Sequence, residues 1–242
     1  MSNPLEARIA LVTGAASGIG RAIAQEMTAQ GATVAATDRS APALDVAGVW
    51  AMDVTDAEAV ARVIATVVEN LGPIDVLVNC AGVSIPAAIE DDQYFDAWDA
   101  TMAVNLAGQV RLVRACLPYL MREETGRVIN IASTEGLGAT PYLGAYTASK
   151  HGVVGITRSL ACEIGPRGVT VNCICPGPIR TGMTEIIPEK DKERFARRRV
   201  PLARYGEPAE IAAVVAFLAS TASSYVNGAV IPVDGGLSCK FG

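Results

Sequence analysis

Histidine is almost absent from this sequence of 242 residues. The single histidine, His151, we interpret as structural. No Cys and His residues stand at the spacing of a zinc site, so we expect no metal. We interpret the cysteines as buried free thiols rather than metal ligands or disulfides. They lie in apolar strand patterns or helical patterns: Cys80, Cys116, Cys162, Cys173 and Cys175.

Charged residues are also scarce, and acidic residues slightly outnumber basic ones. Only 19% of residues are charged, and the net charge of −5 argues against nucleic acid, which requires a basic face. No apolar stretch approaches the roughly 20 residues needed to cross a bilayer. The first residues contain neither a basic region nor an apolar core, so no signal peptide is expected. These features predict a cytoplasmic protein without a membrane partner.

Apolar residues make up half of the chain, and its length suits one α/β domain spanning residues 1–242. Strand patterns alternate with helix patterns, which predicts a doubly wound parallel sheet with helices on both faces. The expected strands are 8–13, 32–37, 48–52, 75–80, 126–132, 168–175 and 229–233. The expected helices are 19–30, 56–71, 96–121, 145–165 and 208–219.

A glycine-rich turn follows the first expected strand and precedes the first expected helix. This context is typical of a dinucleotide-binding site. Gly14 permits the tight turn, Gly18 lets the backbone approach a pyrophosphate, and Gly20 lets the helix pack close to the strand. The pyrophosphate would lie on the free N–H groups at the helix N-terminus.

Tyr146 and Lys150 are four residues apart in an expected helix, and Ser133 stands thirteen residues before Tyr146. Four residues correspond to about 400° of rotation, so both side chains project from one face. An ammonium beside a phenol favours the phenolate and lowers its pKa from about 10. Ser133, at the end of a strand, can bind the same substrate oxygen. A lone Tyr-x-x-x-Lys is more often an ordinary helix surface, and the glycine-rich turn favours the catalytic interpretation here.

The joint pattern resembles the short-chain dehydrogenase/reductase family from about residue 8 to 237. It consists of Thr13-Gly14-x-x-x-Gly18-x-Gly20, Asn79-Cys80-Ala81-Gly82, Asn105, Ser133, Tyr146-x-x-x-Lys150, Pro176-Gly177-Pro178-Ile179-x-Thr181 and Val233-Asp234-Gly235-Gly236. The nearest groups are the 3-oxoacyl reductases and NAD-linked secondary-alcohol dehydrogenases. The resemblance implies a Rossmann-type fold and an oxidoreductase that transfers hydride between NAD(H) and a secondary alcohol or ketone.

Cofactor choice depends on Asp38, at the end of the second expected strand and 18 residues after Gly20. A carboxylate there can accept hydrogen bonds from both hydroxyls of the adenine ribose and repels a 2′-phosphate. Arg39 could instead pair with such a phosphate, or lie over the adenine, or be solvated. We expect NAD.

The resemblance implies further cofactor contacts. Asp53 and Val54 would hold the adenine, Ile179 and Thr181 the nicotinamide carboxamide, and Lys150 the nicotinamide ribose. The remaining expected contacts are Ser17, Ile19, Asn79, Ala81, Gly82, Tyr146, Pro176 and Gly177. Asp75 opens the fourth expected strand, where a role in the fold is as plausible as a cofactor contact.

The resemblance also implies the catalytic roles. Tyr146 is the acid or base, Ser133 binds the reacting oxygen, and Asn105 holds a water that links Lys150 to solvent. Without the resemblance, a structural asparagine within a helix would be preferred for Asn105. A sensor that binds the cofactor without turnover is a further alternative, although all four catalytic positions are present.

The substrate is less well defined. We expect Ser133, Glu135, Tyr142 and Tyr146 on one wall of its pocket, and Met183 on the other, within a lid near 182–205. The lid carries seven cations, which form a solvated helix face or attract a carboxylate or coenzyme A phosphate. They are Lys190, Lys192, Arg194, Arg197, Arg198, Arg199 and Arg204.

Carrier-protein reductases tend to be basic just before the strand that leads to Ser133. Here the segment reads Arg122-Glu-Glu-Thr-Gly126, whose carboxylates would repel an acidic carrier. We therefore favour a small-molecule hydroxy compound as substrate, with a 3-oxoacyl thioester of acyl carrier protein or coenzyme A as the alternative. The resemblance also implies a homodimer or homotetramer, paired through helices 96–121 and 145–165 and through the C-terminal strand with Tyr225.

Overall fold

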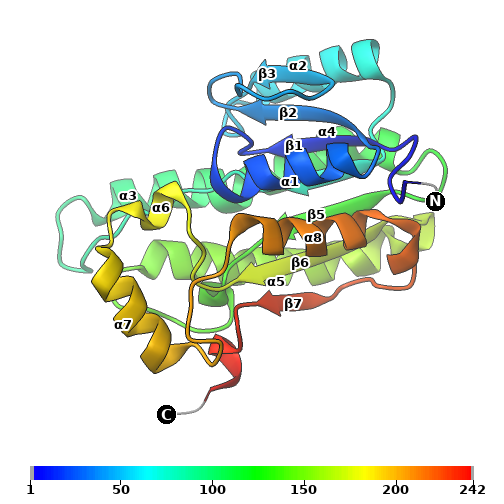
Figure 1. Cartoon of the computed structure of the whole chain (residues 1–242). Helices are drawn as coiled ribbons and strands as arrows, with labels where there is room; N and C mark the ends of the chain where they lie inside the picture. The colour runs from blue at the N-terminus through cyan, green and yellow to red at the C-terminus, as the bar shows by residue number, and fades with distance from the viewer. Residues whose placement is uncertain (1–2, 241–242) are drawn as a thin grey trace.

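Seven parallel strands form one sheet in the computed structural model, which describes residues 3–240. The strands are β1 (Ile9–Thr13), β2 (Thr33–Asp38), β3 (Gly48–Ala51), β4 (Val76–Asn79), β5 (Arg127–Ile131), β6 (Thr170–Pro176) and β7 (Val230–Val233). Their order across the sheet is β3-β2-β1-β4-β5-β6-β7 (Figure 1). The sequence prediction of a Rossmann-type sheet is confirmed, and each strand agrees with its expected range to within two residues.

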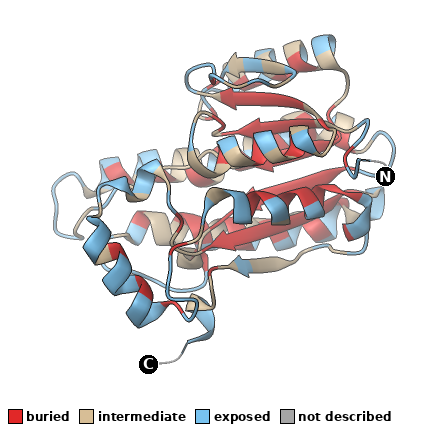
Figure 2. Cartoon of the chain, viewed as in Figure 1, coloured by how far each residue is buried: buried red, intermediate tan, exposed pale blue. Residues whose placement is uncertain are grey.

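Helices cover both faces of this sheet. α1 (Gly18–Ala29) and α8 (Pro208–Ala219) pack on one face, where Val12, Val34 and Ile129 point. α2 (Ala57–Leu71), α4 (Gln109–Leu120) and α5 (Gly144–Ile164) pack on the other, with Leu11 and Leu77. The central strands are therefore buried on both sides, and the exposed residues of the helices lie on their outer surfaces (Figure 2).

The segment expected as one long helix, 96–121, is in fact three pieces. α3 (Tyr94–Met102) and α4 are joined by a π-helical turn over Ala103–Gly108. At Gly108 the chain passes so close to β3's following loop that a Cβ atom would lie 2.9 Å from Val54 Cγ2. A π-helical turn inserts one residue into the helix and redirects the side chains around it. Here it carries Asn105, one of the expected site residues.

Asp75 stabilises the fold at the amino edge of the sheet, opposite the end where the site residues lie. Its carboxylate accepts a hydrogen bond from the Ile9 amide at 2.9 Å and pairs with Arg122 at 3.5 Å. The alternative of a cofactor contact for Asp75 is therefore wrong. The same geometry corrects the inference that the carboxylates of residues 122–126 would repel an acidic carrier protein at the site. They precede β5, so their carboxylates lie at the edge opposite this chain's Ser133.

The interpretation of the cysteines as buried is correct only in part. Cys116, Cys173 and Cys175 are buried and Cys80 is half-buried, but Cys162 and Cys239 are exposed. Cys162 belongs to α5, whose outer face is open in the single chain. Within residues 3–240 all six thiols are free, and no helix there is long and apolar enough to cross a membrane.

Candidate active site

A cavity of about 710 Å³ opens at the carboxyl ends of the strands. It lies where the strand order reverses between β1 and β4, which is where doubly wound sheets bind ligands. Most of the expected site residues line it: Gly14, Ser17, Gly18, Ile19, Gly20, Asp38, Arg39, Asp53, Val54, Ala81, Gly82, Ser133, Tyr146, Lys150, Pro176, Gly177, Ile179, Thr181 and Met183. Segments far apart in the sequence thus meet around one space.

The glycine-rich turn is shaped by close backbone contacts. Gly14 and Gly18 have positive φ angles of 68° and 52°, which favour glycine. A Cβ on Gly14 would lie 2.8 Å from the Ala81 backbone, and one on Gly20 only 2.1 Å from the Gly14 carbonyl oxygen. The turn therefore packs directly against the end of β4 and the start of α1, leaving the N-terminus of α1 facing the cavity.

Thr13 fixes this turn, and the sequence analysis assigned it no separate role. Its hydroxyl accepts hydrogen bonds from the backbone amides of Cys80 and Ala81, at 3.0 and 3.1 Å. The hydroxyl thereby ties the end of β1 to the end of β4. The signal was present, since a threonine directly before the glycine-rich turn belongs to the motif.

Two carboxylates face the outer half of the cavity. Asp38 accepts hydrogen bonds from the Arg39 amide at 2.7 Å and from the Ala16 amide at 3.1 Å. Asp53 accepts from the Thr55 hydroxyl at 2.7 Å and the Thr55 amide at 2.8 Å, and these bonds hold the pKa of Asp53 below its usual value. Both side chains are thereby held in fixed orientations.

Asn79 and Asn105 do not line the cavity, contrary to expectation. Asn79 is fully buried and donates to Asn130 at 2.9 Å, between β4 and β5. Asn105 accepts from the Val83 amide at 2.8 Å and donates to the Val83 carbonyl and the Ser149 hydroxyl. Their amides hold the surrounding chain in place, and Asn105 lies next to Lys150 across the space left by Gly82.

Ser133, Tyr146 and Lys150 converge at the inner end of the cavity. Ser133 follows β5, and its hydroxyl lies near enough to the Tyr146 phenol to lower the phenol's pKa. Lys150, one turn beyond Tyr146 on α5, places its ammonium 5.5 Å from the centre of the Tyr146 ring. The same ammonium donates to the Ile131 carbonyl at 2.8 Å, so the helix is tied to the strand that leads to Ser133.

The acidity of these groups differs from the sequence expectation. Burial raises the pKa of Tyr146, although the hydrogen bond from Ser133 opposes that effect. Burial also lowers the pKa of Lys150 to about 8. The lowered pKa expected for Tyr146 is not found, because burial is the largest effect on the phenol and raises its pKa. Tyr146 is therefore protonated at neutral pH.

The expected substrate residues separate into two groups. Ser133, Tyr146 and Met183 line the cavity. Glu135 does not, because its carboxylate accepts hydrogen bonds from the hydroxyls of Thr140 and Thr147. Tyr142 also lies outside it, with 68% of its surface exposed and a positive φ of 67°. Of the residues expected on this pocket wall, Ser133 and Tyr146 line the cavity, whereas Glu135 and Tyr142 do not.

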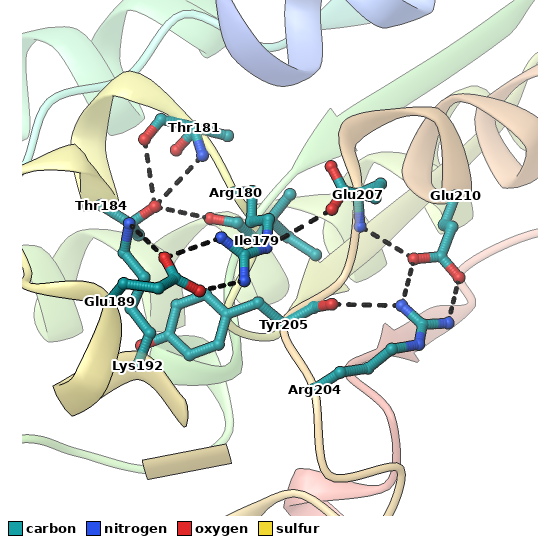
Figure 3. Close-up of polar contacts among 10 residues, drawn as sticks. All are labelled: Ile179, Arg180, Thr181, Thr184, Glu189, Lys192, Arg204, Tyr205, Glu207 and Glu210. Atoms are coloured by element: carbon teal, nitrogen blue, oxygen red, sulfur yellow. Dashed lines mark hydrogen bonds and ion pairs between the residues drawn. The ribbon is translucent and has the colours of Figure 1, made fainter. Parts of the chain in front are cut away.

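The lid consists of α6 (Gly182–Glu185) and α7 (Glu189–Arg199), which the sequence analysis did not predict as separate helices. Arg180 anchors it: the guanidinium pairs with Glu189 of α7 and, at 3.5 Å, with Glu207 before α8 (Figure 3). Thr181 and Thr184 form a capping box at the start of α6. The threonine spacing could have revealed this helix start.

The cations of the lid are largely neutralised within the chain. Four of the seven form ion pairs with nearby carboxylates: Lys192, Arg194, Arg197 and Arg204. Arg204 makes two hydrogen bonds to Glu210, at 2.6 and 2.7 Å, beside the Arg180 cluster (Figure 3). The interpretation as a charged outer helix face fits these pairs better than a free anion-attracting lid.

Comparison with known proteins agrees with this architecture. A family described as enoyl-(acyl carrier protein) reductase matches residues 14–238. A 3-oxoacyl-[acyl-carrier-protein] reductase from Thermotoga maritima is 42% identical, over 96% of this chain and 98% of that protein. A meso-2,3-butanediol dehydrogenase from Serratia marcescens is 37% identical, over 97% and 96%.

A solved structure from Agrobacterium tumefaciens is also similar. It is described provisionally as a 2-deoxy-D-gluconate 3-dehydrogenase, holds bound NADP, and superposes with a TM-score of 0.90 at 35% identity over 99% of both chains. This chain belongs to the short-chain dehydrogenase/reductase family. It is an oxidoreductase that acts on CH–OH groups.

The contact between Gly20 and Gly14 generates a stability prediction. We expect Gly20→Ala to lower the free energy of unfolding by roughly 1–3 kcal/mol, because the added methyl would overlap the Gly14 carbonyl. Urea unfolding measures the effect. The control is Gly155→Ala on the exposed face of α5, where a Cβ meets nothing within 4 Å and alanine should stabilise by about 0.5–1 kcal/mol. Equal stability of Gly20→Ala and wild type would contradict the packing described.

Burial of Lys150 generates a second prediction. Because its pKa falls to about 8, the charged form costs about 3 kcal/mol at pH 7. We expect Lys150→Met to raise the melting temperature by several degrees at pH 7 and by less at pH 10, where the folded lysine is already neutral. Lys190→Met, at an exposed position, is the control. A destabilised Lys150→Met at both pH values would show that the Ile131 hydrogen bond outweighs desolvation.

Proposed function

We propose that this protein is an NAD(H)-dependent dehydrogenase of a small secondary alcohol or the corresponding ketone. The observation that supports it most directly is the convergence of Ser133, Tyr146 and Lys150 at the inner end of a cavity that a glycine-rich turn borders. That arrangement places an acid or base beside a space large enough for a dinucleotide.

The cavity fits a nicotinamide dinucleotide. The N-terminus of α1 suits the pyrophosphate, Asp38 and Arg39 border the end suited to the adenosine, and Ile179 and Thr181 border the inner end. The close contacts at Gly14 and Gly20 leave the space that side chains there would fill. When bound, the dinucleotide supplies the hydride donor or acceptor.

The remaining chemistry comes from the side chains. Tyr146 gives its phenolic proton to the carbonyl oxygen during reduction, and as phenolate takes the proton of the alcohol during oxidation. The Ser133 hydroxyl binds the same oxygen and stabilises the charge that develops there, by about 3 kcal/mol in comparable sites. Lys150 stabilises the phenolate electrostatically, and Asn105 holds the loop at Val83 in place beside it. Since Tyr146 is protonated at neutral pH, oxidation should require a higher pH than reduction.

We propose NAD rather than NADP because of Asp38. Its carboxylate borders the cavity and is held by two backbone amides, so it cannot easily turn away from a ribose. A 2′-phosphate at that position would meet a fixed negative charge. The A. tumefaciens structure holds bound NADP, so the fold itself does not exclude that cofactor, and the proposed preference for NAD rests on Asp38 of this chain.

For the substrate, we propose a small hydroxy compound such as a diol. The cations of the lid that would attract a phosphate-bearing thioester are largely paired with carboxylates. The charged residues that border the cavity are Asp38, Arg39, Asp53 and Lys150, all in the region assigned to the dinucleotide. A 3-oxoacyl thioester is the alternative, favoured by the similarity to the T. maritima reductase.

We also propose that the protein forms a homodimer or homotetramer. Large apolar side chains are exposed on the single chain near both expected interfaces: Phe95 on α3, Val110 on α4, Phe217 on α8, and Tyr225 before β7. Such residues are commonly covered in oligomers.

The reaction is tested by NADH oxidation with acetoin, the ketone of a butanediol, with Tyr146→Phe as the matched variant. We expect turnover to fall at least about 100-fold in the variant, because the proton donor is removed, while NADH affinity stays within about twofold. Absorbance at the NADH band and fluorescence titration measure the two quantities. Full activity of Tyr146→Phe would overturn the proposed mechanism.

The same assay with acetoacetyl-CoA separates the two substrate classes. Faster Tyr146-dependent turnover of the thioester than of acetoin would favour the alternative and leave the mechanism intact. Bound NADH without turnover of any ketone or alcohol would instead support a non-catalytic sensor.

Cofactor choice has its own test. We expect wild type to prefer NADH to NADPH, and Asp38→Ala to gain NADPH use by roughly 10-fold or more, because the repulsion of the 2′-phosphate is removed. Asp53→Asn is a useful comparison, since Asp53 is also fixed but lies after β3 rather than at the expected ribose position. A wild type that prefers NADPH would contradict the role given to Asp38.

A further inference from the structure

Glu135 occupies the junction between the serine turn and the helix that carries Tyr146. It belongs to a short 3-10 turn, Thr134–Gly136, immediately after Ser133. Its backbone amide donates to the Ser133 hydroxyl at 3.1 Å, while its carboxylate accepts from the Thr147 hydroxyl at 2.8 Å. Thr147 directly follows Tyr146 in α5. One residue therefore contacts both sides of the catalytic pair.

We propose that Glu135 is a positioning residue, which holds Ser133 at hydrogen-bonding distance from Tyr146 and keeps a negative charge beside the phenol. This rests on the proposed function, in which Ser133 and Tyr146 act on one oxygen. It assigns to Glu135 a role different from the substrate contact that the sequence suggested.

The geometry supports a tight connection between the turn and the helix. The second carboxylate oxygen of Glu135 accepts from the Thr140 hydroxyl at 2.6 Å, so both oxygens are engaged. At Gly136, a Cβ would lie 2.8 Å from the Lys150 carbonyl oxygen, and the Gly136 amide donates to the Ser133 carbonyl at 2.9 Å. The turn thus lies against α5 from Thr147 to Lys150, and the carboxylate fixes its position along the helix.

The charge acts on Tyr146 together with the other groups near the phenol. The Ser133 hydroxyl lowers the pKa of the phenol, and the Lys150 ammonium lies 5.5 Å from the ring centre. The charge of Glu135 and that of an ionised Cys80 both raise the pKa of Tyr146. Cys173 and Cys175 lie near Lys150 rather than near the phenol. Because Glu135 is the one carboxylate in this set, removing its charge should make Tyr146 more acidic.

The first experiment compares Glu135→Gln with wild type in alcohol oxidation across pH. Glutamine keeps an oxygen that can accept the Thr147 bond but removes the charge. We expect the midpoint of the kcat/KM profile to move to lower pH, while kcat at the optimum stays within about threefold of wild type. An unchanged midpoint would overturn the electrostatic part of the proposal.

The second experiment tests positioning. We expect Thr147→Val to lower kcat by roughly 10-fold or more, because the turn loses its bond to the helix, while the Kd for NADH is unchanged. Thr147→Ser keeps the hydroxyl and should restore kcat, and Thr140→Val, which removes only the outer bond, should have little effect. Equal kcat for Thr147→Val and Thr147→Ser would overturn the positioning role, as would parallel loss of kcat and NADH affinity.

Glu135→Ala removes both contacts and the charge, so its melting temperature must be measured beside its activity. If it does not fold, the Gln and Val variants still decide the proposal. Failure of this inference is distinct from failure of the proposed function. An inactive Tyr146→Phe with unchanged Glu135 and Thr147 variants contradicts only the inference, whereas an active Tyr146→Phe contradicts the mechanism itself.

Discussion

The hydrogen bond from the Lys150 ammonium to the Ile131 carbonyl is the contact on which the site depends. It joins the middle of the catalytic helix to the last residue of β5, two residues before Ser133. A buried ammonium is unfavourable, and the depression of the pKa of Lys150 to about 8 shows how strongly the site opposes the charge. In the proposed mechanism this costly charge lies beside Tyr146 and stabilises its phenolate. Stability and reactivity thus place opposite demands on one residue.

The sheet makes this arrangement possible because its seven strands are parallel and their carboxyl ends lie at one edge. Neighbouring parallel strands place Thr13, Asp38 and Ser133 within one cavity although they are far apart in the sequence. Side chains then connect the strand ends: Thr13 ties β1 to β4, and Asn79 pairs with Asn130 across β4 and β5. Such cross-strand bonds hold backbone groups that the loops alone would leave free to move. A rigid scaffold under flexible loops is what precise positioning requires.

Local patterns explain why so much of the fold was predictable. Apolar runs marked the seven strands, and the glycines at 14, 18 and 20 marked the turn, since each signal lies within a few residues. The π-helical turn at Ala103–Gly108 left no such local signal, and its Gly108 lies against Val54, a residue distant in the sequence. The direction of Asn79, the partners of Glu135 and the acidity of Tyr146 depend on residues from other elements. Sequence motifs identified most of the residues that line the cavity, but not which motif residues lie outside it.

The guanidinium of Arg180, at the start of the lid, is paired with carboxylates of the chain and does not face the cavity. Arg180 stands between two cavity residues, Ile179 and Thr181, yet its guanidinium turns outward to Glu189 and Glu207. The residues of this segment that line the cavity are Thr181, just before α6, and Gly182, Met183 and Thr184 of α6. Exposed ion pairs contribute little to stability, so their main effect here is to connect α7 to the start of α8. The proposal of a small uncharged substrate therefore rests on a wall whose cavity-lining side chains carry no charge.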